Sequence, residues 1–227
     1  MRQKLCYCVV VSLLCLVQAS AQQYPAPFPR PNAEKLLEND RLIAWKVIWP
    51  KDQPTPLHEH PFDQLSVTLA GGQVKVTRLS GNAVVNNSVV GSVAFTPKGT
   101  IHVEEGISDS PQQKIMLELK PSAAPISDVA ADSEMLARQG AVKLLENDRL
   151  IAWGITWEAG REIQFPAGRL DSVAVFVAPG IVRATTRQGA KDTSVKPGDL
   201  AFTPRGAEPQ KQSAVQGTPR AVIVWLK

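Results

Sequence analysis

The sequence predicts an all-β protein built from two copies of one unit, and two observations support this prediction. First, residues 35–45, KLLENDRLIAW, recur unchanged as residues 143–153, and residues 91–99 align with residues 198–206 at nearly the same spacing. An identity of this length indicates an internal repeat. Second, each copy consists of short apolar stretches separated by Gly, Pro and Asn, a pattern typical of sandwiches and barrels.

The first 21 residues have the features of a secretory signal peptide. Residues 1–4 are basic, residues 5–17 are largely apolar, and residues 19–21 (ASA) are the small residues that a signal peptidase requires. The apolar stretch is shorter than the roughly 20 residues that cross a bilayer. We therefore expect cleavage after Ala21 and export to a periplasm or out of the cell, with no membrane contact afterwards.

The composition argues against several function classes for the mature chain. The three cysteines, Cys6, Cys8 and Cys15, all lie in the segment to be removed, so neither disulfides nor a thiol nucleophile is expected. Removing Arg2 and Lys4 leaves 23 of the 25 basic residues against 21 acidic ones. This balance, without a dense basic segment, gives no reason to expect a nucleic-acid partner.

The rest of the chain divides into four segments. Residues 22–33 form a proline-rich arm, which either packs along the first unit or acts as a spacer. Residues 34–120 form the first unit and residues 141–227 the second. The linker, residues 121–140, opens with a Pro- and Ala-rich stretch and contains a candidate helical turn over residues 132–138.

Alternating apolar residues predict the strands of each unit. Large apolar side chains occupy every second position from Ile43 to Trp49, and again from Ile151 to Trp157. Residues 74–76 and 115–119 predict further strands. Both copies keep the tryptophans, so we interpret these as core residues.

The three histidines of the chain indicate a metal site. His58 and His60 are two residues apart in an extended segment, so their side chains share one face. His102 follows the turn signal Pro97-Lys98-Gly99, which lets it arrive from a neighbouring strand. Three imidazoles on one face can bind one metal ion, and Gln64 could complete the set.

The pattern around these histidines resembles the two motifs of the cupin family, G-x5-H-x-H-x3,4-E-x6-G and G-x5-P-x-G-x2-H-x3-N. The residues that fit are His58, His60, Gly71, Gly91, Pro97, Gly99 and His102. The departures are Asp52 for the first glycine, Gln64 for the glutamate and Gly106 for the asparagine. The resemblance implies two tandem jelly-roll β-barrels, a bicupin, with metal ligands at His58, His60, Gln64 and His102; in the family the Gln64 position is usually a carboxylate.

The second unit lacks this site. Alignment of the repeats places Pro166, Gly168, Ser172 and Pro209 on His58, His60, Gln64 and His102. None of these residues can replace an imidazole. We therefore expect one metal ion per chain, in the first unit, and a degenerate second unit.

Side chains that follow the predicted ligand Gln64 alternate between the two faces of one strand. With Gln64 facing the cavity, Ser66 and Thr68 face it too, and Leu65, Val67 and Leu69 face away. The corresponding inward set in the second unit is Ser172, Ala174 and Phe176, and the outward set is Val173, Val175 and Val177. The second cavity is thus partly filled by apolar side chains. Both outward sets are apolar, so we expect the units to pack sheet to sheet.

These features predict a protein that binds a divalent transition metal (Fe, Mn, Zn, Ni, Co or Cu) and a small-molecule partner. Glu104, two residues beyond His102 on the same face, and Asp63 are candidate general bases; the alternative for both is a solvated surface carboxylate. The cupin resemblance implies a dioxygenase, decarboxylase, isomerase or lyase acting on a small oxygen-rich compound. The alternatives are a non-catalytic ligand-binding protein and a purely structural role. A homo-oligomer remains open.

Overall fold

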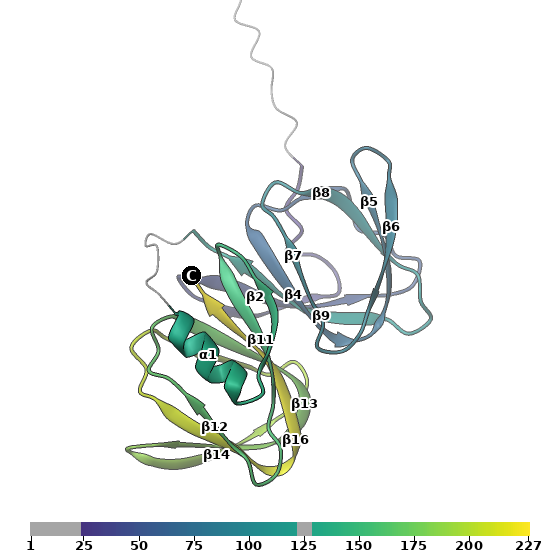
Figure 1. Cartoon of the computed structure of the whole chain (residues 1–227). Coiled ribbons are helices and arrows are strands. Elements are labelled where there is room, and N and C mark those ends of the chain that lie inside the picture. Colours follow the sequence, from purple (N-terminus) through teal and green to yellow (C-terminus); the bar gives the residue numbers. More distant parts are fainter. Residues whose placement is uncertain (1–23, 122–128) are drawn as a thin grey trace, which may run out of the picture.

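The computed structural model describes residues 24–121 and 129–227, which form two halves of antiparallel strands (Figure 1). The predicted signal peptide and its three cysteines lie outside the described residues. Within the described residues no helix is long and apolar enough to cross a bilayer. The all-β prediction is confirmed.

The first half contains two sheets that face each other across an interior. Its strands are β1 (Ala33–Glu38), β2 (Leu42–Trp49), β3 (His58–Glu59), β4 (Asp63–Ala70), β5 (Gly72–Arg78), β6 (Ala83–Ser88), β7 (Val93–Thr96), β8 (Ile101–Gly106) and β9 (Gln112–Leu119). One sheet has the order β1-β2-β9-β4-β7 and the other the order β3-β8-β5-β6. The strands predicted around residues 74–76 and 115–119 are β5 and β9.

The second half repeats this arrangement with longer strands. It comprises α1 (Ala130–Arg138), β10 (Val142–Glu146), β11 (Leu150–Thr156), β12 (Glu162–Phe165), β13 (Asp171–Thr186), β14 (Gly189–Val195), β15 (Leu200–Thr203) and β16 (Gln210–Leu226). Because β13 and β16 each run through both layers, the strands form one seven-stranded sheet. The predicted helical turn is α1, which buries Leu136 in the core of this half.

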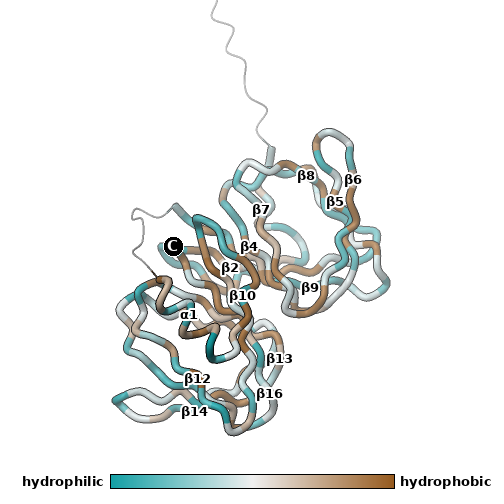
Figure 2. Tube along the Cα trace, in the orientation of Figure 1, coloured by the Kyte–Doolittle hydropathy of each residue, from teal (hydrophilic) through white to brown (hydrophobic). Residues whose placement is uncertain are grey.

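The outward faces of the two halves form one shared core. Leu65 and Val67 of β4 and Val173 and Val175 of β13 are fully buried and belong to a single apolar cluster. Figure 2 shows the apolar segments gathered where the halves meet. The predicted sheet-to-sheet packing is confirmed by this cluster.

The repeated LLENDR segment forms matching ion pairs and hydrogen bonds between the two halves, one set from each copy. Arg41 forms an ion pair with Asp171 at 3.3 Å, and Arg149 forms one with Asp63 at 3.3 Å. Each arginine also donates to the carbonyl groups at the end of the other half's last strand, Arg41 to Lys227 and Arg149 to Lys120. Both copies of the segment therefore serve the same contact between halves.

The proline-rich arm packs along the first half. Phe28 stacks on Trp45 with ring centroids 4.9 Å apart, the Glu59 N–H donates to the Pro25 carbonyl, and the Ile48 N–H donates to the Asn32 carbonyl. Of the two alternatives, the arm is thus part of the fold.

Candidate metal centre

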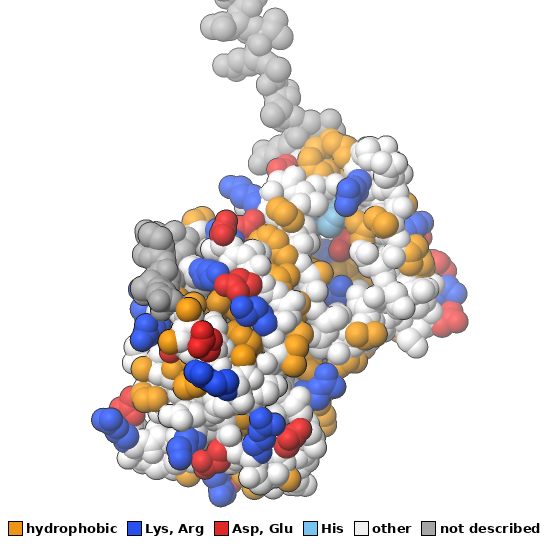
Figure 3. All heavy atoms as spheres, in the orientation of Figure 1, with side chains coloured by type: hydrophobic (Ala, Val, Ile, Leu, Met, Phe, Trp, Pro, Cys, Tyr) orange, Lys and Arg blue, Asp and Glu red, His pale blue; other side chains and the backbone are white. Residues whose placement is uncertain are grey.

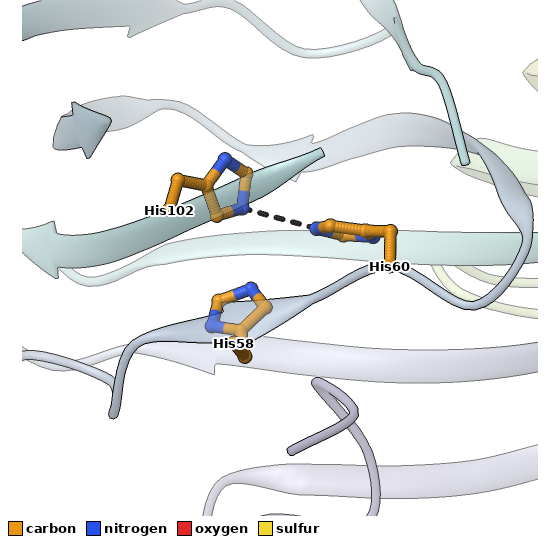
Figure 4. Close-up of side chains that lie close together, drawn as sticks. All are labelled: His58, His60 and His102. Atoms are coloured by element: carbon orange, nitrogen blue, oxygen red, sulfur yellow. Dashed lines mark hydrogen bonds between the residues drawn. The ribbon is translucent and has the colours of Figure 1, made fainter. Parts of the chain in front are cut away.

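The three histidines converge inside the first half (Figure 4). His58 lies on β3 directly opposite His102 on β8, and His60 follows β3. All three side chains are buried, and one ring nitrogen from each lies within 4.8 Å of the others. His60 Nε2 and His102 Nε2 are 3.0 Å apart, close enough for both nitrogens to bind one ion.

The hydrogen bonds of the imidazoles leave lone pairs for a metal. His58 Nδ1 lies 2.9 Å from the Pro56 carbonyl oxygen, which can only accept a hydrogen bond, so Nδ1 carries the hydrogen. The lone pair of His58 Nε2 is therefore available to bind a metal. His58 Nε2 is buried with no hydrogen-bond partner among the described residues, and His60 Nε2 and His102 Nε2 face each other at 3.0 Å. Unpartnered buried polar atoms are costly unless a ligand satisfies them. The residues present therefore fit a metal ion.

Gln64 is the fourth predicted ligand, on the inward face of β4. Its side chain is 1% exposed, and neither its amide oxygen nor its amide nitrogen has a partner within the described part of the chain. A buried, unpartnered amide has the same need for a ligand as the histidines. Its role as a ligand remains a prediction.

The environment keeps the histidines neutral. Burial, the neighbouring His102 and His58, and Arg30 lower the pKa of His60 to about 4, against the opposing effect of Glu104. Burial likewise lowers the pKa of His58 and of His102. Neutral imidazole is the form that binds metals, so the cluster is ready to coordinate at neutral pH.

Glu104 lies beside the histidines, with its two carboxylate oxygens in different roles. Oε2 accepts a hydrogen bond from Trp49 Nε1 at 3.1 Å and pairs with Arg30 at 3.5 Å. Oε1 lies 3.9 Å from His102 Nε2. The pKa of Glu104 lies below its ordinary value: burial raises it, while Arg30 and the histidines in their protonated form lower it. Glu104 therefore lies beside His102, and its role as a base stays a prediction.

Asp63, the other candidate base, serves a different purpose. One of its oxygens accepts the Lys98 N–H at 2.9 Å, and the other pairs with Arg149 of the second half. Because Asp63 directly precedes Gln64 in β4, its side chain lies on the opposite face of the strand. Asp63 thus fixes a turn and the contact between the halves, and its role as a base stays a prediction.

A cavity of 630 Å³ opens beside the triad and contains residues that the sequence argument missed. His102, Glu104, Trp49, Arg78 and Lys114 line it. Figure 3 looks onto this hollowed face of the first half, where a histidine and charged side chains show in the opening. Lys114 and Met116 are two residues apart on β9, so alternation places both side chains on the same, inward face of the sheet. Nothing in the sequence placed Arg30 beside Glu104, because the docking of the arm is a tertiary event.

The second half repeats the backbone of the site without its chemistry. The Gly168 N–H and carbonyl bond to Ala207 and Gly206, as the His60 backbone bonds to Thr100 and Gly99. The cavity of this half is only 110 Å³ and is lined largely by aromatic and aliphatic side chains, Trp157, Phe165, Leu170, Phe176, Ile223 and Trp225 among them. The predicted apolar filling of the second cavity is confirmed.

The low pKa of His60 predicts a pH-dependent stability of the metal-free protein. Unfolded histidine binds a proton near pH 6.5 and folded His60 only near pH 4, so the unfolded state binds more protons between these values. Stability is therefore retained above about pH 6.5 and falls as the pH drops towards 4, by at most about 3 kcal/mol from this residue. Urea unfolding of wild type and His60→Asn across this range measures the difference. Parallel profiles would contradict the prediction.

Comparison with solved structures identifies the fold. The sequence matches no protein-family model and no curated protein. AerE from Microcystis aeruginosa is similar in structure, with a TM-score of 0.62 and 12% identity over 91% of this chain and 100% of that one. A cupin 2 conserved barrel domain protein from Leptotrichia buccalis has a TM-score of 0.55 and 14% identity, covering 86% of this chain and 88% of that one.

A third similar structure is the salicylate 1,2-dioxygenase from Pseudaminobacter salicylatoxidans. Its TM-score is 0.59 and its identity 14%, over 85% of this chain and 75% of that one. Identities this low establish the fold alone. Together with the histidine cluster, they show that this chain has the cupin fold, with a candidate metal centre in its first half.

Proposed function

We propose that this chain is an exported, metal-dependent cupin enzyme acting on a small oxygen-rich compound. The observation that carries the proposal is the triad of buried, neutral imidazoles with unpartnered nitrogens beside a 630 Å³ cavity. His58, His60 and His102 would hold the ion, with Gln64 as the predicted fourth ligand. With these neutral ligands a divalent ion keeps its full charge, and when bound it polarises an oxygen donor or acidifies water.

The residues of the chain supply the remaining functions. Glu104, ionised at neutral pH and fixed by Trp49 and Arg30, has its Oε1 free to accept a proton from a substrate hydroxyl beside His102. Trp49 and Met116 form apolar walls of the cavity, which orient a carbon skeleton and exclude water. Dioxygenase chemistry is the first to test, because one protein with this fold is a dioxygenase.

Export is proposed from residues 1–21 alone, whose basic, apolar and small-residue segments follow each other in the order of a signal peptide. A mature N-terminus beginning at Gln22 in the exported fraction would support it.

The test is elemental analysis of the mature protein, followed by turnover under air of the Fe²⁺- and Mn²⁺-loaded forms, with the chelator-treated protein as control. Near one transition-metal ion per chain, with oxygen uptake or product formation lost on chelation, supports the proposal. No bound metal after reconstitution overturns it. Bound metal with tight ligand binding and no turnover would identify the alternative, a non-catalytic binding protein.

The role of Gln64 can be measured separately. Gln64→Glu is expected to raise zinc affinity about tenfold, because a carboxylate is a better ligand for a divalent ion than a neutral amide. Ser172→Glu, at the equivalent position of the second half, is the control and should leave zinc affinity unchanged. Competition with a chelating dye gives both values. An unchanged affinity in Gln64→Glu would remove Gln64 from the ligand set.

A further inference from the structure

The cavity beside the triad has a surplus of positive charge. Its charged lining residues are Arg78, Lys114 and Glu104. Glu104 is already paired with Arg30 at 3.5 Å. Two cations therefore face the cavity, and the one carboxylate among its described lining residues, Glu104, also pairs with Arg30.

Lys114 lies in this interior on β9. Among residues 24–121 and 129–227 its ammonium has no hydrogen-bond or ion-pair partner; the Trp49 ring lies 5.9 Å away, and the charge of Glu104 acts on it without a direct ion pair. Burial lowers the pKa of Lys114, because an ammonium group is less stable in this interior than in water. A partly buried cation without an ion-pair partner is stabilised by an anion that binds beside it.

The fold does not require a lysine at this position. Lys114 pairs with Val47 and Thr68, and in the second half Ala221 pairs with the equivalent residues Ile155 and Phe176. The same position in the same architecture thus packs with a methyl group. A charged side chain at this position is particular to the half that carries the histidines.

We propose that Lys114, assisted by Arg78, forms a carboxylate-binding subsite, so that the substrate of this cavity is a small organic acid. Arg78 is exposed at the end of β5, opposite His102 on β8, where it meets an entering anion at the rim. Lys114 pairs with the carboxylate inside, and the carbon skeleton lies against Trp49 and Met116. The inference rests on the proposed function for its assignment of the anion as substrate.

The experiment compares benzoate with benzamide, which have nearly the same shape and differ in charge. Their dissociation constants are measured by calorimetry on the chelator-treated protein and on the zinc-loaded protein. Wild type is expected to prefer benzoate, and Lys114→Met to weaken benzoate binding about tenfold or more with little change for benzamide, since a charge-assisted pair is lost. Lys114→Arg should restore most of the preference.

Lys46→Met is the matched control. Lys46 lies on the neighbouring strand β2, paired with Ile115, and alternation places it on the opposite face of the sheet from Lys114. It should leave both ligands unaffected. If wild type shows no preference for benzoate, or if Lys114→Met keeps the preference, the inference is overturned. Arg78→Ala, at an exposed position, provides a second loss-of-preference test that does not depend on the folding of a core variant.

The two proposals can fail separately. A Lys114-dependent preference in the metal-free protein, with no metal bound after reconstitution, would keep the anion subsite and overturn the metal-dependent enzyme. Metal-dependent turnover, with the same preference for benzoate over benzamide in wild type and Lys114→Met, would keep the metal-dependent enzyme and overturn the anion subsite.

Discussion

Replacing both His58 and His60 with alanine is expected to lower the affinity for a divalent transition metal by about a thousandfold or more, because even the loss of a ligand's hydrogen-bond partner costs roughly 10–100-fold. Of the three imidazoles within 4.8 Å of one another, only His102 would remain. Zinc affinity by dye competition and metal content by elemental analysis measure the effect.

Pro166→Ala is the control for this substitution, because Pro166 occupies the position equivalent to His58 in the second half. It should bind zinc as wild type does. Retention of wild-type zinc affinity by the double histidine variant would place the metal elsewhere and remove the basis of the proposed function. Circular dichroism of each variant separates metal loss from unfolding.

The fold was predictable because its determinants are local and occur twice. Alternation from Ile43 to Trp49 and from Ile151 to Trp157 is the period of a strand, and the repeat doubles the evidence. The continuous strands β13 and β16 were not predicted, because sequence pattern gives element type more reliably than element boundaries.

The triad was predictable because H-x-H spacing and a turn before His102 fix which face each imidazole occupies. The same rule separates Asp63 from the cavity: it is adjacent to Gln64, so the two side chains point to opposite faces of the strand. Its partner Arg149 lies 86 positions away in the chain, and no local pattern indicates that pair.

The electrostatics of the site could not be predicted. Arg30 reaches Glu104 only because Phe28 stacks on Trp45 and the arm docks on the first half. Composition predicts an extended arm, but the surface that an extended segment packs on depends on tertiary contacts. The lone charge of Lys114 likewise appears only once the cavity has formed around it.

The shared core makes the two halves depend on each other, and Leu117→Ala measures this. Leu117 is fully buried, pairs with Ala44 and Leu65, and belongs to the cluster that joins the halves. Its truncation is expected to lower the free energy of unfolding by about 2–5 kcal/mol, from lost apolar burial and the cavity left behind. Urea unfolding measures this loss.

Leu79→Ala is the same truncation at a side chain that is 55% exposed, and it should change stability by less than about 0.5 kcal/mol. Because β4 and β13 contribute to one core, Leu117→Ala should weaken protection in both halves. Hydrogen exchange of peptides from β2 and from β11, followed as urea rises, reports the two halves separately. Coincident loss of protection would show that the halves unfold together; loss in β2 alone would show that the second half is stable by itself and that the apolar contact between them is not cooperative.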